Sequence, residues 1–254
     1  MSEKQDGKTW DTHWRDYDAS ASRNPAQAYR RKLVMDALRA GQHAKVLDLG
    51  CGQGDLLMIA RAELPQLEYF GVDGSEEGLR LTAERNPGIG IWLVDLDSED
   101  EPTPSHLSGW ADFCICTEVL EHLDEPKYAI RRAHSLLREN GELLVTVPGG
   151  PKSAYDLHIG HRRHFRPKEL RALLEAEGFE AVHAYGAGFP FFNLYRLAVI
   201  MRGEGLISEA ASSQMSRLAR FTMALFDFLF RFNVDESCFG WQTVAIARKG
   251  NRQR

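Results

Sequence analysis

Short apolar runs alternate with segments of helical spacing along most of the chain. The runs are rich in aliphatic and aromatic residues and predict strands at 44–49, 68–72, 90–94, 111–116 and 142–147. Apolar positions three or four residues apart predict the intervening helices, at 54–63, 75–85 and 126–138. Strands that alternate with helices in this way indicate βαβ units, in which a parallel sheet is covered by helices on both faces.

The same pattern extends on either side of this alternation. A helix is expected at 26–39, where Gly41 stops it, and another at 168–177. Two further strands are expected at 180–185 and 241–248, which brings the total to seven. Connection rules then favour a doubly wound, Rossmann-like α/β sheet, with its ligand crevice at the carboxyl ends of the strands.

Four regions follow from this order of elements. Residues 1–39 combine an aromatic-rich segment with the first helix, residues 40–186 form the core, and residues 239–254 hold the last strand and a tail. The remaining region, 187–238, is too long for a hairpin loop and too apolar for a disordered linker. It is therefore expected to be a helical insertion before the last strand.

An aromatic repeat at helical spacing dominates the second half of this insertion. It comprises Phe221, Leu225, Phe228, Leu229 and Phe232. The favoured interpretation is a cap that covers the crevice and shapes an apolar pocket for a substrate. A homodimer seam, a surface that lies on a membrane, and a plain second layer of core are the alternatives.

Composition narrows the partners and the compartment. The 254 residues carry a net charge of −5, which gives no whole-protein reason to expect nucleic acid. The four cysteines form no CxxC pair and are expected to be reduced thiols of a cytoplasmic protein. No run reaches the roughly 18 apolar residues of a membrane span, so only peripheral membrane association remains open.

A glycine-rich turn carries the strongest chemical signal. It reads Asp48-Leu49-Gly50-Cys51-Gly52-Gln53-Gly54 and leads from a predicted strand into a helix. Glycines let a ligand approach the backbone, and the following helix offers free N–H groups. An acidic residue two positions before the first glycine suits a ligand that carries positive charge better than a pyrophosphate. Asp73 and Asp95 end the next two strands. There the Asp73 carboxylate can accept hydrogen bonds from the hydroxyls of a ribose, and the Asp95 carboxylate can accept one from an adenine amino group.

These segments resemble the class I S-adenosylmethionine-dependent methyltransferases, and in particular the ubiquinone-pathway O-methyltransferases. The matching motifs are VLDLGCGQG, GVDGS, VDLD, ADFCICTEVLEHL and LLRENGELLVTVP, in the right order over about residues 40–185. The resemblance implies a sheet whose last strand is antiparallel. It also implies a set of residues that bind S-adenosylmethionine: Asp48, Gly50, Cys51, Gly52, Gly54, Asp73, Gly74, Asp95, Leu96, Thr117 and Glu118.

The stretch from Glu118 to His122 leaves a metal site open. If it is helical, Glu118, Glu121 and His122 share one helix face, and this spacing is similar to that of metal-dependent 2′-O-methyltransferases of small RNAs. Those enzymes add a later histidine, for which His158, His161 and His164 are candidates. The alternative, which the sequence favours, is that His122 only caps or packs a helix.

A second histidine-rich stretch, HIGHRRHF, supplies candidates for a catalytic base. His158 and His161 lie in it, and His122 is the third candidate. The expected reaction transfers a methyl group to a small or lipid-like acceptor, most simply at oxygen. An RNA 2′-O-methyltransferase and a regulatory protein that binds the cofactor without turnover are the alternatives.

Overall fold

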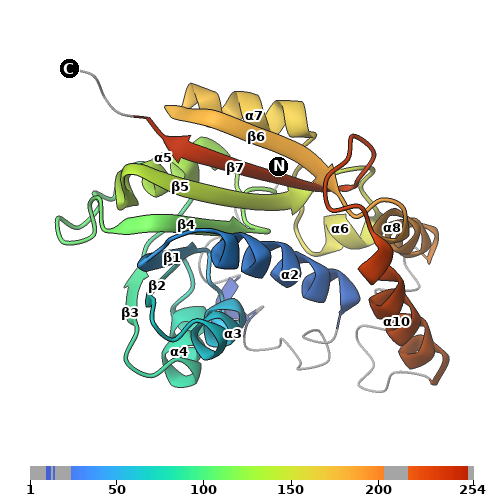
Figure 1. The fold of residues 1–254 in the computed structure, drawn as a ribbon. Coiled ribbons are helices and arrows are strands. Elements are labelled where there is room, and N and C mark those ends of the chain that lie inside the picture. The colour runs from blue at the N-terminus through green and yellow to red at the C-terminus, as the bar shows by residue number, and fades with distance from the viewer. Residues whose placement is uncertain (1–9, 13, 15–23, 203–216, 251–254) are drawn as a thin grey trace.

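The computed structural model describes residues 10–12, 14, 24–202 and 217–250. They form a seven-stranded sheet in the order β3-β2-β1-β4-β5-β7-β6 (Figure 1). The strands are β1 Lys45–Leu49, β2 Glu68–Asp73, β3 Gly90–Leu93, β4 Ala111–Thr117, β5 Leu137–Pro148, β6 Phe179–Ala187 and β7 Gln242–Lys249. Strands β1 to β5 are parallel, and β7 runs antiparallel between β5 and β6. The predicted fold class, including the antiparallel last strand, is confirmed.

The helices cover both faces of this sheet. They are α2 Pro25–Ala40, α3 Asp55–Glu63, α4 Glu76–Arg85, α5 Pro126–Leu136, α6 Ala154–His158, α7 Pro167–Ala176, α8 Phe191–Arg202 and α10 Arg217–Leu229, with a 3-10 turn η2 at Phe230–Phe232. Because successive strand residues point to opposite faces, Val46 packs in one core cluster and Leu47 in the other. Helices α2 and α3 cover the first face, and α5 and α7 cover the second.

Local sequence signals account for where several helices begin. The Asn24 side chain accepts a hydrogen bond from the Ala26 N–H (2.9 Å) and caps α2, whose first residue is Pro25. Ser75 caps α4 in the same way, through the Gly78 N–H at 3.0 Å. The starts of α2, α4, α5 and α7 thus coincide with a side-chain cap or with proline, whereas α3 starts after Gly54 without a side-chain cap.

The insertion at 187–238 is helical in its described part. Helices α8 and α10 pack with α2 around a third cluster that includes Tyr29, Phe192 and Phe230. The predicted aromatic repeat does not face this cluster, because Phe221 and Phe228 are 66% and 52% exposed. None of the described helices is long and apolar enough to cross a membrane.

Candidate cofactor pocket and histidine network

The glycine-rich turn lies where β1 ends and α3 begins. The Gly50 N–H donates to the Val72 carbonyl (2.7 Å), and its φ of +82° belongs to the left-handed region that glycine tolerates. A Cβ on Gly50 would lie 2.2 Å from the Val119 side chain. Gly50 therefore allows a close approach between two loops at the carboxyl edge of the sheet.

Asp73, at the end of β2, holds this turn in place. Its carboxylate accepts hydrogen bonds from the Gly52 N–H (2.8 Å) and the Ser75 N–H (2.9 Å). Burial raises the pKa of the Asp73 carboxyl, while these backbone donors oppose the shift. The carboxylate is thus oriented by the protein before any ligand arrives.

A pocket with about 650 Å³ of space, partly open to solvent, lies beside the turn. Its walls come from the loops that follow β1, β2, β3 and β4, together with two N-terminal tryptophans. The lining consists of Trp10, Trp14, Gly50, Asp73, Gly74, Asp95, Leu96, Asp97, Glu118, Val119, His122 and Leu123. Four of these residues are carboxylates and none is a lysine or arginine, so the pocket favours a ligand with positive charge.

Asp48 in β1, two residues before the pocket-lining Gly50, is 2% exposed. Its Oδ1 atom has no hydrogen-bond partner among the described residues. Burial, with a smaller contribution from the charge of Asp73, raises the pKa of Asp48 to about 7. A buried carboxyl with an unused oxygen and a pKa near neutrality is ready to ionise when a cation binds nearby.

The predicted cofactor residues divide into two groups in the structure. Six of them line the pocket: Gly50, Asp73, Gly74, Asp95, Leu96 and Glu118. The other five, which do not line it, are Asp48, Cys51, Gly52, Gly54 and Thr117. Gly54 is one example of a residue outside the lining. It is the N-cap of α3, with a φ of +75°, and a Cβ built on it would lie 2.7 Å from the Asn86 side chain.

Several lining residues were not expected from the sequence. Trp10 and Trp14 belong to a segment whose polar and aromatic mixture predicted no element. Asp97, two positions after Asp95, also lines the pocket, and its carboxylate accepts hydrogen bonds from the Asp124 and Glu125 N–H groups. The acidic run LVDLDSED was the only sequence signal for it.

Glu118 is held by three different elements. Its Oε1 accepts hydrogen bonds from Gln242 of β7 (2.8 Å) and Thr146 of β5 (3.2 Å), and Arg30 of α2 lies 3.4 Å from Oε2. Its φ of +56° is uncommon for a residue with a side chain, and such strain gathers at functional sites. Residues 118–122 consequently form a bend and a turn rather than the helix that the metal hypothesis required.

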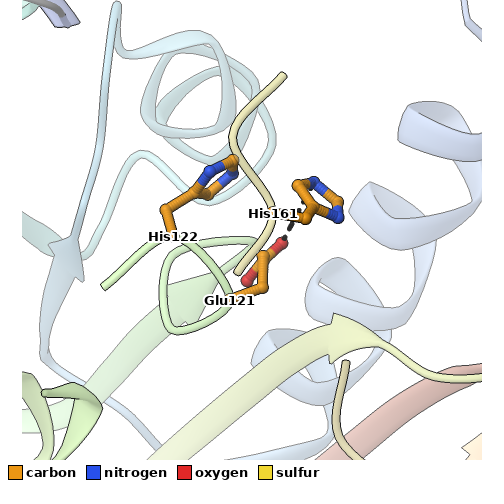
Figure 2. Close-up of side chains that lie close together, drawn as sticks. All are labelled: Glu121, His122 and His161. Atoms are coloured by element: carbon orange, nitrogen blue, oxygen red, sulfur yellow. Dashed lines mark ion pairs between the residues drawn. The ribbon is translucent and has the colours of Figure 1, made fainter. Parts of the chain in front are cut away.

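This turn still brings three potential ligands together (Figure 2). Ligand atoms of Glu121, His122 and His161 lie within 4.8 Å of one another, and His161 Nε2 is 4.0 Å from Glu121 Oε1. Glu121 is fully buried, and neither of its carboxylate oxygens has a hydrogen-bond partner among the described residues. Burial, followed by the charge of Glu118, raises the pKa of Glu121 well above its usual range.

Two of the predicted metal candidates do not join this group. Glu118 is directed to its partners on β5, β7 and α2, as described above. His158 ends α6 and is exposed. The group found in the structure therefore differs from the one that the sequence spacing suggested.

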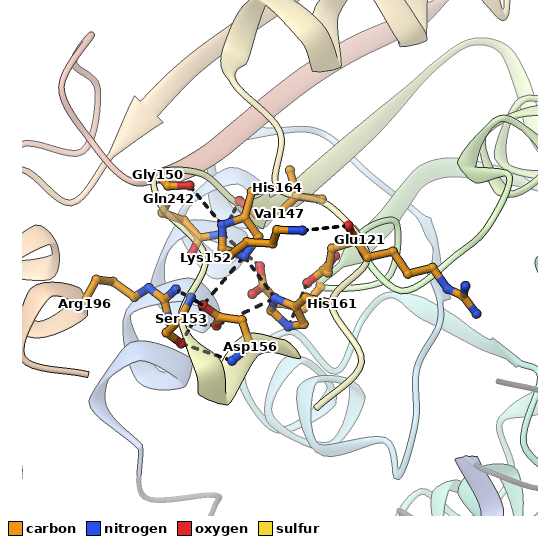
Figure 3. A network of polar contacts seen from close by, with 12 residues as sticks. Glu121, Val147, Gly150, Lys152, Ser153, Asp156, His161, His164, Arg196 and Gln242 are labelled. Carbon is orange, nitrogen blue, oxygen red and sulfur yellow. Dashed lines mark hydrogen bonds and ion pairs between the residues drawn. The ribbon is translucent and has the colours of Figure 1, made fainter. Parts of the chain in front are cut away.

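Behind His161 lies a network in which nearly every polar group is paired (Figure 3). Asp156 accepts hydrogen bonds from the Ser153 hydroxyl (2.8 Å) and from both terminal nitrogens of Arg196 (2.6 and 3.1 Å). His161 Nδ1 is 3.2 Å from His164 Nε2, and the His122 and His161 rings meet edge to face at 4.8 Å. A chain of imidazoles thus connects the pocket wall to a buried carboxylate.

The pKa of Asp156 in this network is shifted in the opposite direction to the pKa values of Asp48 and Asp73. Arg196 and the Ser153 backbone lower the pKa of Asp156 to about 2, despite an opposing effect of burial. Burial, with the charge of His122, lowers the pKa of His161 to about 3. Asp156 is therefore ionised and His161 neutral at physiological pH, and the lowered pKa makes the His161 imidazole a weak base.

The arginines of HIGHRRHF bind the loop to the protein. Arg162 donates to the His122 carbonyl (2.7 Å) and forms an ion pair with Asp124, and Arg163 donates to the Asp124 carbonyl (2.8 Å). These contacts fix the loop against the 118–124 turn. The loop therefore positions histidines, and its arginines have a structural role.

Comparison with known proteins relates the chain to methyltransferases. A family model described as a methyltransferase domain matches residues 17–184. The chain is similar to a ubiquinone biosynthesis O-methyltransferase of Pseudomonas aeruginosa, with 29% identity over 61% of this chain and 72% of that protein. An uncharacterised 37.1 kDa protein in transposon TN4556 of Streptomyces fradiae is 31% identical over 61% of this chain, which spans 46% of that protein's length.

Solved structures agree on the fold. A SAM-dependent methyltransferase from Thermotoga maritima, described as a possible histamine N-methyltransferase, superposes with a TM-score of 0.56 at 16% identity. The match covers 87% of this chain and 89% of that one. At this identity the likeness concerns the architecture of the sheet and its helices.

Proposed function

Since the chain belongs to the family of S-adenosylmethionine-dependent methyltransferases, we propose that it transfers a methyl group from this cofactor to an oxygen of a small or lipid-like acceptor. The observation that carries the proposal is the pocket beside the glycine turn, which is lined by four carboxylates and by no lysine or arginine. S-adenosylmethionine has a sulfonium and an ammonium group, and this lining suits both.

The cofactor contacts follow from where the predicted residues lie. We assign the ribose to Asp73, the adenine side to Asp95 and Leu96, and the methionine part to the turn around Gly50 with Asp48 below it. Glu118 then lies at the reactive end of the pocket, next to His122. Gly52 and Gly54 shape the turn. Gly74 is proposed to line the bound cofactor, and Cys51 and Thr117 to lie next to residues that line it.

The chemistry needs alignment more than it needs acid–base groups. A lone pair of the acceptor oxygen attacks the methyl carbon, the carbon–sulfur bond breaks, and its electron pair stays on sulfur as a neutral thioether. The acceptor's proton leaves to a base. We assign this base to His122, which lines the pocket, with neutral His161 behind it; His158 is too far toward the surface to serve.

The acceptor is proposed to be a small molecule with an apolar part. The Pseudomonas relative is named as an O-methyltransferase of ubiquinone biosynthesis, which supports oxygen as the target. The insertion at 187–238 supports an apolar part, since α8 reaches the histidine network through Arg196 and carries the exposed apolar side chains Leu194, Leu197 and Met201. We therefore retain a cap over the acceptor side as the role of the insertion, with residues 40–186 as the cofactor-binding core.

Calorimetric titration of the full chain with S-adenosylmethionine and S-adenosylhomocysteine tests the proposal. Micromolar binding of both, followed by transfer of a labelled methyl group to an acceptor mixture, is the expected result. Binding without any labelled product would favour the regulatory alternative. The absence of heat and of a thermal shift with either ligand would refute cofactor binding.

A second candidate is a metal-dependent form of the same reaction, as in RNA 2′-O-methyltransferases. It is favoured by Glu121, His122 and His161, since buried carboxylate oxygens without hydrogen-bond partners fit a cation. A divalent ion held there would polarise the acceptor oxygen. Turnover that EDTA abolishes and Mg²⁺ restores supports this form, and turnover indifferent to EDTA excludes it.

A further inference from the structure

Two tryptophans of the N-terminal segment form a wall of the cofactor pocket, although no sequence motif pointed to them. Both rings line the pocket, with centroids 6.4 Å apart and planes inclined by 28°. Asp11, between them in sequence, accepts hydrogen bonds from the Ser75 hydroxyl and the Glu77 N–H at the start of α4. The segment is thus docked on the core, which places the two rings.

The two rings serve different ends of the pocket. Trp14 covers the turn and the start of α4: a Cβ built on Gly52 would lie 2.4 Å from its ring, and one on Gly78 would lie 3.1 Å from it. Trp10 lies on the other side, where its ring meets the His122 ring edge to face at 4.8 Å. Trp10 is therefore the aromatic wall at the end that holds Glu118 and His122.

The charge of the ligand changes at that end during the reaction. S-adenosylmethionine carries a sulfonium cation there, and S-adenosylhomocysteine carries a neutral thioether. An aromatic face attracts a cation within about 6 Å, and the attraction is stronger when water is excluded. An aromatic ring beside the sulfonium thus stabilises the cofactor more than the product.

We propose that Trp10 is a specificity-determining residue that contacts the sulfonium group and makes the protein prefer the charged cofactor over its neutral product. Trp14, which covers the turn, contributes equally to the binding of both. This assignment rests on the cofactor binding proposed above. It gives the N-terminal aromatic segment a part in product release, because the attraction disappears when the methyl group leaves.

The test compares the affinities of the two ligands across three variants of the full chain. Trp10→Leu retains an apolar side chain without a π face, Trp10→Phe retains a smaller π face, and Trp14→Leu is the matched control in the same segment. We expect Trp10→Leu to weaken S-adenosylmethionine about five- to tenfold and S-adenosylhomocysteine less than twofold. Trp10→Phe is expected to fall between wild type and Trp10→Leu, and Trp14→Leu to weaken both ligands by the same factor.

Equal losses for both ligands in Trp10→Leu would overturn the proposal and leave Trp10 as a packing residue. Unchanged affinities in that variant would overturn it as well, and a selective loss in Trp14→Leu would contradict the assignment to Trp10. The ratio of the two affinities is insensitive to a partly unfolded sample, because both ligands report on the same folded fraction. Wild-type protein that binds neither ligand would instead refute the proposed function itself.

Discussion

Asp48 and Asp156 are both buried aspartates at the carboxyl edge of one sheet, yet their surroundings differ in kind. Asp48, two residues before the pocket-lining Gly50, has an oxygen without a hydrogen-bond partner and a pKa of about 7. Asp156 lies in the histidine network, is paired with Arg196 and Ser153, and has a pKa of about 2. Burial acts to raise the pKa of both aspartates. At Asp156 the hydrogen bonds and charge of its partners outweigh burial, so the pKa of Asp156 falls while that of Asp48 rises.

The difference between the two aspartates suggests that the surroundings of Asp48 serve ligand binding, whereas those of Asp156 serve structural stability. A buried carboxyl whose charge the protein does not neutralise is costly unless a ligand supplies the cation. A buried carboxylate with a full set of hydrogen-bond and ion-pair partners stabilises the fold. Its removal is expected to lower the free energy of unfolding more than it lowers catalysis. Four substitutions test whether the two regions behave in these two ways.

Asp156→Asn should have the largest effect, a loss of about 3 kcal/mol in the free energy of unfolding, because Arg196 keeps its charge without a counter-ion. Denaturant unfolding at pH 7 measures it. The wild-type advantage should be present above the ordinary pKa of aspartate, near 3.8, and should vanish as the pH falls toward 2. The double variant with Arg196→Met should recover part of the loss; a single-variant loss below about 1 kcal/mol would contradict the structural role.

Asp73→Ala should act mainly on the ligand. Cofactor affinity is expected to fall at least tenfold, about 1.4 kcal/mol, because the turn loses the acceptor for two backbone N–H groups and the ribose loses its partner. Calorimetric titration measures the change, and the exposed Asp36→Ala in α2 is the matched control. An affinity unchanged in Asp73→Ala would place the ribose elsewhere.

Asp48→Asn should change how stability depends on pH. In the wild type the raised pKa favours the folded state at low pH, so this contribution is lost as the pH rises from about 4 through 7. Between pH 6 and 8 the wild type should lose about 1 kcal/mol that the variant keeps. Cofactor affinity should rise over the same interval in the wild type alone, and parallel profiles for the two proteins would show that Asp48 is not titrating.

Glu121→Gln should have the smallest effect on stability, below about 0.5 kcal/mol at pH 7, since burial raises the pKa of this carboxyl well above its usual range and the uncharged amide has nearly the same shape. Thermal unfolding measures it. The same variant sharpens the metal question: it should leave turnover unchanged if no ion binds, and it should remove any stimulation by Mg²⁺ if one does. A loss of stability above about 2 kcal/mol would move Glu121 into the class of Asp156.

The sheet and the glycine turn were predictable because their signals are local. The run at 90–94, for example, becomes β3 at Gly90–Leu93, and the turn residues need only their own φ angles and neighbours. The 118–122 stretch was misleading for the opposite reason. Its helical spacing is local, whereas Gln242, which helps to hold Glu118, is 124 positions away.

Contacts between residues far apart in the sequence also explain why the positions of Trp14 and of the aromatic repeat were not predicted. Nothing near Trp14 in sequence indicates that it covers Gly52, and a helical repeat such as Phe221 to Phe232 does not reveal which face the rest of the chain will bury. The repeat predicted α10 correctly, but Phe226 and Phe230, which lie between its members, make the contacts with the core. Periodicity identifies a helix, and only the packed structure orients it.

The place of β7 between β5 and β6 affects how the chain is made as well as how it is held. During synthesis, β5 and β6 emerge before the strand that joins them, separated from it by residues 188–241. At 5–20 residues per second the ribosome needs roughly 3 to 11 s for that interval. Through it, two adjacent strand edges remain open to other nascent chains, so slowing translation within α8 or α10 should raise aggregation without altering a single contact of the finished protein.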